Sequence, residues 1–271
     1  MHVDPDRIAG DSPDEVEFLY REIFTRRTYL RYGLMLPNGS VVFDVGANVG
    51  IFSLFVHAVC PTASVFAFEP LPPAFANLRH NLGVYGVRAR LFNHGLSDSD
   101  QEVPFLYYPR HSALSTRAIY ADEPTDRDIV QRTVEGRKRR TGDTGARPVA
   151  AEELAGPPLA SEEYVCRQRP LSDVIDEQGI ERIDMLKIDV QRSELDVLQG
   201  IRERHWPLIL QVAAEIHDGP GLPTWGRLGT VITLLIGHGF QVTAAQEPDF
   251  VGTDRYMVYA SRTLASHEVS P

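Results

Sequence analysis

VVFDVGANVG, residues 41–50, is the stretch that decides the fold of this chain. Its first residues are apolar and end at Asp44, which is typical of a short buried strand, and the apolar run 51–56 is typical of a helix. The chain must turn tightly between these two elements, and Gly46 and Gly50 supply the backbone freedom and bare surface that such a turn needs beside a ligand. The sequence therefore predicts a strand, a ligand-binding loop and a helix.

A second strand is predicted at 63–68, and it ends in Glu69 and Pro70. An acid at the tip of the second strand, about 20 residues after the first loop, can accept hydrogen bonds from ribose hydroxyls. Asn48 takes the place of a middle glycine in the loop, and Asn tolerates positive φ. The N–H groups of the new helix predict a site for a polar ligand. The alternative is a βαβ unit that binds nothing.

The ligand is either a dinucleotide or S-adenosylmethionine (SAM). A dinucleotide fingerprint that starts at Gly46 would need glycine at position 48 and a small residue at position 51, where this chain has Asn48 and Ile51. SAM has no phosphates and asks instead for two carboxylates. Asp44 can face its amino-acid end and Glu69 can face its ribose. The loop therefore favours SAM, and an NAD-dependent enzyme is the weaker alternative.

Four motifs in order resemble the FkbM family of SAM-dependent methyltransferases, many of which methylate hydroxyls of natural products. The motifs are FDVGANVG at 43–50, FAFEP at 66–70, GLSD at 95–98 and MLKIDVQRSELDVLQGI at 185–201. The resemblance runs from about residue 26 to residue 260. It implies an α/β fold with a Rossmann-like, seven-stranded class I methyltransferase sheet, helices on both faces and an antiparallel last strand.

The predicted organisation is one methyltransferase domain, 37–271, behind an N-terminal helical extension, 1–36. Apolar residues at helical spacing predict a helix that starts at Asp11 or Ser12. Two tyrosines of the extension, Tyr29 and Tyr32, could lean over the cofactor, although plain packing is the favoured interpretation.

Seven further strands are expected after the one predicted at 63–68. Their ranges are 88–97, 103–108, 164–169, 183–189, 208–216, 240–245 and 256–260.

Residues 109–163 form an irregular insertion that we expect to act as a lid over the acceptor. The basic run 137–140 suits an acidic carrier protein or a phosphate-bearing substrate, although a solvated charge run is the commoner explanation. The residues of the insertion expected near the active site are Arg110, His111, Ser112, Ser115 and Thr116.

The candidate cofactor site combines the loop, the two acids and the ends of later strands. The resemblance implies that the end of the third strand lies beside the adenine, where His94 could contact the ring. A histidine on the protein surface is about as good an interpretation of His94. The complete set is Asp44, Gly46, Ala47, Asn48, Gly50, Glu69, Pro70, His94, Ser97 and Asp189.

The candidate catalytic residues stand at the ends of the fourth and fifth strands: Asp189, Glu215 and His217. An alcohol loses its proton as it attacks the methyl group, and a histidine has a suitable unperturbed pKa to receive it. We therefore predict His217 as general base, oriented by Asp189 or Glu215, with a structural cap as the alternative reading. A Mg²⁺ ion on Asp189, Glu215 and Asp218 is a second route, but a metal-free site is mildly favoured.

The chain departs from the family pattern after the strand KIDV. The usual Glu-Gly is replaced by Gln191 and Arg192, so no role of that glutamate can be carried over, whereas Glu194 matches the family.

Composition limits the function further. A formal net charge of -10 argues against a nucleic-acid partner, and no apolar stretch or leader pattern suggests a membrane or secretion. We expect a cytoplasmic O-methyltransferase acting on a hydroxyl of a polyketide-, peptide- or sugar-type intermediate, free or tethered to a carrier protein. An N-methyltransferase and a catalytically silent SAM-binding domain of a larger synthase are the alternatives.

Overall fold

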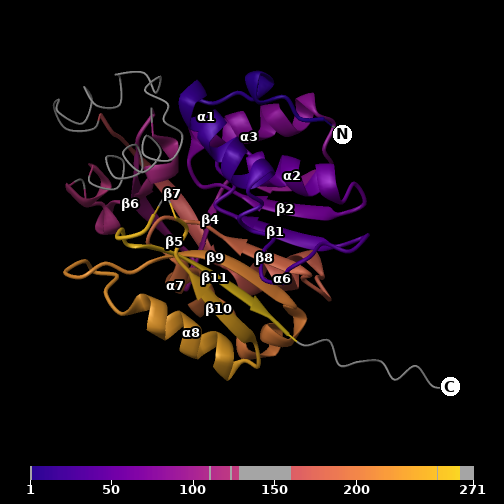
Figure 1. The fold of residues 1–271 in the computed structure, drawn as a ribbon, viewed down its shortest axis with the longest axis vertical. Helices are drawn as coiled ribbons and strands as arrows, with labels where there is room; N and C mark the ends of the chain where they lie inside the picture. The colour runs from indigo at the N-terminus through magenta and orange to yellow at the C-terminus, as the bar shows by residue number, and fades with distance from the viewer. Residues whose placement is uncertain (1, 110, 123, 128–159, 249, 263–271) are drawn as a thin grey trace.

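A seven-stranded sheet with the order β10-β11-β9-β8-β1-β2-β3 forms the centre of the computed structural model (Figure 1). The structure describes residues 2–109, 111–122, 124–127, 160–248 and 250–262. The strands of this sheet are β1 (Val41–Val45), β2 (Ser64–Phe68), β3 (Ala89–Phe92), β8 (Met185–Ile188), β9 (Gln211–His217), β10 (Gln241–Ala245) and β11 (Arg255–Ser261). β11 pairs antiparallel with both neighbours, and the remaining pairings are parallel. The predicted class I methyltransferase sheet is confirmed.

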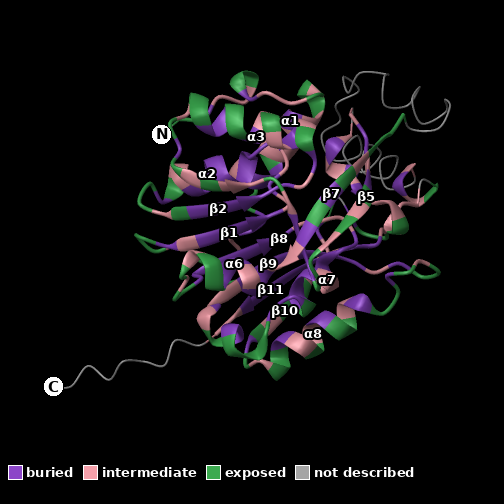
Figure 2. Ribbon diagram, turned by 180° about the vertical axis from the view of Figure 1, so that it is seen from behind, coloured by how far each residue is buried: buried purple, intermediate pink, exposed green. Residues whose placement is uncertain are grey.

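Helices cover both faces of this sheet, because its central strands are apolar on both sides (Figures 1 and 2). Val42 of β1 packs in one core cluster, whereas its neighbours Phe43 and Val45 pack in the other. The first cluster includes residues of α1 (Pro13–Tyr20), α2 (Ile51–Val59) and α3 (Pro72–Val84). The second includes residues of α6 (Leu171–Gln178), α7 (Glu194–Gln199) and α8 (Arg227–Gly237).

A second, four-stranded sheet has the order β4-β7-β5-β6. Its strands are β4 (Gly95–Ser97), β5 (Gln101–Tyr107), β6 (Thr116–Arg117) and β7 (Glu162–Pro170). The single strand predicted at 88–97 is therefore wrong, since it is split between the two sheets. The Asn93 side chain donates to the carbonyl oxygens of Glu69 and Pro70 where β3 ends. After this turn the chain pairs with β7 instead.

The N-terminal extension packs on α2 and α3 (Figure 1). Helix α1 begins after Ser12, whose hydroxyl accepts a hydrogen bond from the Glu15 N–H at 3.4 Å. A π-helical turn, Arg21–Thr25, follows and buries Ile23. Within the described ranges, no helix combines the length and the apolar composition that crossing a bilayer requires.

The predicted insertion is only partly described. Most of the expected lid, 128–159, lies outside the described residues, and so do the basic run 137–140 and Arg110.

Candidate active site

The loop between β1 and α2 needs glycine for a reason that the structure makes plain. Gly46 has φ +78°, and a Cβ added to it would lie 1.8 Å from the Asp189 carbonyl oxygen. The two loops at the carboxyl ends of β1 and β8 therefore touch through bare backbone. Asn48 and Gly50 also have positive φ, as the turn chemistry predicts.

A pocket opens over this loop at the carboxyl ends of β1, β2 and β8. Six of the predicted cofactor residues line it: Gly46, Ala47, Asn48, Glu69, Pro70 and Asp189. The lining also includes residues outside the predicted cofactor set, namely Leu19, Ile23, Leu71, Leu96, Phe105, Ser112, Ala113, Ser115, Gln168, Lys187 and Gln191. The N-terminal extension and the start of the insertion therefore both contribute to one site. The prediction for Ser112 and Ser115 agrees with their positions on its wall.

Glu69 is held by backbone N–H groups on both carboxylate oxygens. Oε2 accepts from Asn48 N at 2.9 Å, and Oε1 accepts from Leu71 N at 2.9 Å. Burial raises the pKa of this carboxyl to about 7, although the two N–H groups and Lys187 act in the opposite direction. The acid thus has a fixed orientation at the pocket and spare lone pairs for a ligand.

Lys187 is a site residue that the sequence analysis missed. Its Nζ lies 3.1 Å from Asp44 Oδ1 and 3.8 Å from Asp189 Oδ2, and it donates to the Gly46 carbonyl at 2.7 Å. Burial alone would lower the pKa of Lys187, but the charges of Asp44 and Asp189 raise it overall, so the amine stays protonated. Its position inside an otherwise apolar strand could have indicated this role, since a lysine is seldom fully buried without a charged partner.

Asp44 is fully buried beside this amine and does not line the pocket. Its Oδ2 also accepts a hydrogen bond from Ser53 Oγ at 2.7 Å. The structure thus gives Asp44 a role as counter-ion for Lys187, and its direct contact with the cofactor stays a prediction.

Asp189 lines the pocket and is more open to solvent than the nearby acids, with a side chain 24% exposed against 0% for Asp44 and 5% for Glu215. Tyr29 Oη donates to its Oδ2 at 2.8 Å, and Gln191 Nε2 lies 3.4 Å from its Oδ1. The second contact is long, so Oδ1 keeps acceptor capacity.

Besides Asp44, three predicted cofactor residues lie outside the pocket lining. Gly50 packs on Leu78 of α3, where an added Cβ would meet a leucine methyl at 2.7 Å. His94 is half-buried, lies beside the Phe68 ring and bonds to the Gly95 carbonyl at 3.0 Å. Ser97 is fully buried, and the neighbouring residues Gly95 and Leu96 line the pocket instead. The cofactor contacts of all three stay predictions.

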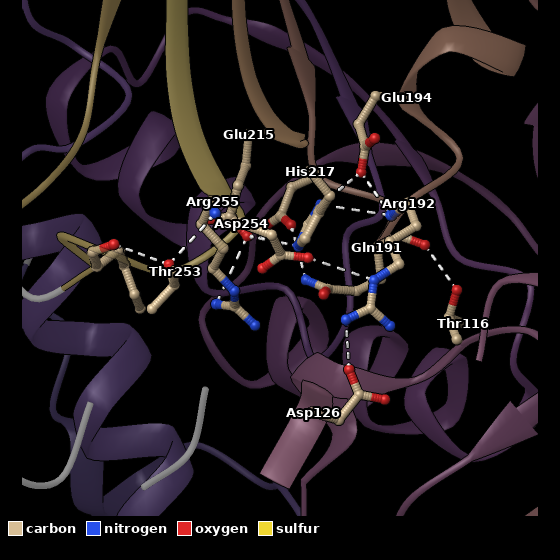
Figure 3. A network of polar contacts seen from close by, with 12 residues as sticks. Thr116, Asp126, Gln191, Arg192, Glu194, Glu215, His217, Thr253, Asp254 and Arg255 are labelled. Atoms are coloured by element: carbon tan, nitrogen blue, oxygen red, sulfur yellow. Dashed lines mark hydrogen bonds and ion pairs between the residues drawn. The ribbon is translucent and has the colours of Figure 1, made fainter. Parts of the chain in front are cut away.

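His217 lies in a buried network of charged side chains (Figure 3). Its Nδ1 is 2.8 Å from Glu194 Oε1, and its Nε2 is 3.6 Å from Glu215 Oε1. Burial would lower the pKa of His217, but the adjacent Glu194 carboxylate raises it overall. The imidazole is fully buried and does not line the pocket. Because its pKa is raised and the ring does not reach the pocket, the role of general base stays a prediction that this geometry does not favour.

The three acids considered for Mg²⁺ occupy different surroundings. Glu215 is buried beside Arg255, whose Nη1 lies 3.5 Å from its Oε1. Asp218 accepts hydrogen bonds from Gly226 N and Leu228 N at the start of α8. Over the part of the chain that the structure describes, no three His, Cys, Asp or Glu side chains converge as metal ligands.

Gln191 and Arg192, the residues that depart from the family pattern, have φ of +46° and +67°. Such backbone conformations are strained for side chains other than glycine. The Arg192 guanidinium lies 2.6 Å from Asp126 and 3.5 Å from Asp254 (Figure 3). Thr116 Oγ1 donates to the Gln191 carbonyl at 2.6 Å. These contacts attach the start of the insertion to the turn after β8.

The comparisons with known proteins agree with this architecture. The model of the methyltransferase FkbM domain matches residues 44–242. The chain is 42% identical over 260 residues to the 31-O-demethyl-FK506 methyltransferase FkbM of Streptomyces tacrolimicus, and the match covers 94% of each chain. It is 32% identical over 255 residues to the methyltransferase sdnD of Sordaria araneosa, with 89% of each chain covered.

Another relative is far longer than this chain. The AMB antimetabolite synthetase AmbE of Pseudomonas aeruginosa is 42% identical over 259 residues, which are 94% of this chain and 12% of that protein. The chain therefore spans a small part of the length of this relative. Together with the sheet, the loop and the matched domain, the similarities show that the chain belongs to the FkbM family of SAM-dependent methyltransferases.

Proposed function

We propose that this chain transfers a methyl group from SAM to a hydroxyl of a natural-product intermediate of the polyketide, peptide or sugar type. The observation that carries the proposal is the joint lining of one pocket by the cofactor loop, Glu69 and the partly exposed carboxylate of Asp189. The similarity to an enzyme named for O-methylation of 31-O-demethyl-FK506 supports a hydroxyl acceptor.

The residues of the pocket fit SAM. Glu69 has spare acceptor capacity on a carboxylate that is fixed by two N–H groups, which suits the paired hydroxyls of a ribose. The apolar side chains of Leu71, Leu96 and Phe105 line the same pocket and suit the face of a purine. When bound, SAM supplies an electrophilic methyl group on a sulfonium sulfur.

Asp189 is the residue that we propose to act on the acceptor. Its Oδ1 takes the proton of the acceptor hydroxyl as the oxygen forms its bond to the methyl carbon and the carbon–sulfur bond breaks, with the electron pair left on sulfur. The loop, the β8–α7 turn and the residues 112–115 hold the two reactants in one orientation, and such positioning supplies much of the rate of a methyl transfer. The positively charged Nζ of Lys187 lies 3.8 Å from the other oxygen, Asp189 Oδ2.

The acceptor is either free or presented on a carrier protein. Similarity to a stretch of a synthetase, AmbE, supports the second form, in which a larger assembly holds the intermediate. An amine acceptor remains the alternative, since the fold does not choose the acceptor atom.

Methyl transfer from tritiated SAM tests the proposal. The purified protein is incubated in chelator with pairs of acceptors that differ only in a hydroxyl or an amine, beginning with 31-O-demethyl-FK506. We expect label in the hydroxyl compounds, and we expect Asp189→Asn to lose transfer while it still binds SAM. Label in the amines alone would refute O-methylation, and wild-type transfer by Asp189→Asn would refute its role as base.

A further inference from the structure

Tyr29 belongs to the N-terminal extension, yet its hydroxyl contacts Asp189, which lines the active-site pocket. The side chain is 3% exposed, and its Oη donates to Asp189 Oδ2 at 2.8 Å across 160 positions of sequence. The matched family domain begins at residue 44, so Tyr29 lies outside it. This hydrogen bond is the shortest one that the structure describes for the Asp189 carboxylate.

The surroundings of Tyr29 hold the phenol in place. Its ring packs edge-on against Phe52 of α2, with the centroids 5.2 Å apart. Tyr259 Oη donates a hydrogen bond to the carbonyl oxygen of the preceding residue, Thr28, at 2.8 Å. This bond attaches the extension to β11. Burial and then the charges of Asp189 and Glu22 keep the pKa of Tyr29 well above its ordinary value. The phenol is therefore a permanent donor over any pH at which the protein works.

The effect of this donor on Asp189 follows from the geometry. It occupies Oδ2, so the second oxygen, Oδ1, is the one left for the acceptor. It also limits rotation of the carboxylate, because a rotated group would lose this hydrogen bond. The other charged or titratable groups near Asp189 are Lys187, Glu22, Glu215 and Arg255.

We propose that Tyr29 is a positioning residue that fixes the orientation of the Asp189 carboxylate, so that the N-terminal extension completes the active site. This inference rests on the proposed function, in which Asp189 takes the acceptor proton. Tyr29 touches neither reactant in this scheme and acts only through the carboxylate.

Tyr29→Phe removes the hydroxyl and keeps the buried ring. With [¹³C]aspartate labelling and bound S-adenosylhomocysteine, NMR reads the carboxyl of Asp189, which is assigned by the loss of its signal in Asp189→Asn. We expect the carboxyl ¹³C chemical shift of Asp189 to change in Tyr29→Phe, because the hydrogen bond to its Oδ2 is lost. Tyr32→Phe is the matched control, because Tyr32 lies in the same segment and is 58% exposed. It should leave this chemical shift unchanged.

The rate of transfer gives a second readout. In Tyr29→Phe we expect kcat to fall by roughly 10- to 100-fold, because the Asp189 carboxylate is no longer held in one orientation, with SAM affinity nearly unchanged. In an Asp189→Asn background, Tyr29→Phe should have no further effect.

The outcomes separate this inference from the proposed function. An unchanged Asp189 carboxyl chemical shift in folded Tyr29→Phe would overturn the role of Tyr29, whatever the acceptor is. A changed chemical shift together with wild-type transfer by Asp189→Asn would leave the hydrogen bond established and refute Asp189 as base. If Tyr29→Phe does not fold, a crystal structure of the wild-type protein with S-adenosylhomocysteine decides. Separation of the two oxygens beyond hydrogen-bonding distance would contradict the inference.

Discussion

Arg192→Gly offers a direct test of why this chain departs from the family pattern. Arg192 has φ +67°, so glycine at this position should relieve about 1 kcal/mol of backbone strain. The same substitution removes a guanidinium that pairs with Asp126 at 2.6 Å, with both side chains at most 4% exposed. Removing one partner of a buried pair costs about 3–5 kcal/mol, because the remaining charge has no counter-ion.

The loss of the ion pair should exceed the relief of strain. Asp126 already has a raised pKa, mainly because it is buried, so it can take up a proton and limit the cost. We therefore expect Arg192→Gly to lower the free energy of unfolding by about 2–4 kcal/mol and the melting temperature by roughly 5–15 °C.

Chemical denaturation followed by the fluorescence of the buried Trp206 measures this change. Gln191→Gly is the matched control, because its φ is +46° and its side chain makes no ion pair. It should be neutral or stabilising by up to about 1 kcal/mol. If Arg192→Gly were as stable as the wild-type protein, the buried pair would not be what maintains the strained turn.

Three further predictions concern the loop, the ribose acid and the buried histidine. Gly46→Ala should abolish SAM binding and lower stability, because its Cβ would lie 1.8 Å from a backbone oxygen. Gly33→Ala is the control, because Gly33 has φ +87° but an added Cβ would meet no atom within 4 Å, so this variant should lose only about 1–2 kcal/mol of unfolding free energy. Equal losses of unfolding free energy in the two variants would refute the close-approach argument. Since burial raises the pKa of Glu69 to about 7, this carboxyl is protonated below that pH and ionised above it. Calorimetry should then show that SAM affinity weakens as the pH falls through about 7, and that Glu69→Gln abolishes this pH dependence. A wild-type affinity that does not change with pH would count against a role of the Glu69 carboxylate in binding SAM. His217→Gln should lower the melting temperature, because Glu194 and Glu215 lose the buried imidazole that lies 2.8 and 3.6 Å from them. Normal melting with slow transfer would instead favour a catalytic base.

The central sheet could be predicted because its signals are local. Apolar runs that end in a glycine loop or an acid fix β1, β2 and β8, and each of them reappears within a residue or two of its predicted range. The break at Asn93 was missed because it depends on pairing between Gly95 and Gln168, 73 positions apart, which no periodicity reveals.

The site residues that follow strands directly could be predicted from the sequence, whereas those whose role depends on how deeply they are buried could not. Glu69 and Asp189 follow strands directly, so their place at the pocket could be inferred from strand order. Strand position alone could not show that His217 is fully buried between two carboxylates. Nor could it show that Lys187 reaches Asp44, because that contact depends on the register of β1 with β8.

Calorimetric titration with SAM in chelator, on the wild-type protein and on Glu69→Gln, tests the central claim most directly. If the pocket over the Gly46–Gly50 loop holds the cofactor, the wild-type protein should bind SAM with micromolar affinity. Glu69→Gln should then bind about 10-fold or more weakly, because it loses charge-assisted hydrogen bonds to the ribose. No binding by the wild-type protein, or equal binding by the variant, would contradict the assignment of this pocket.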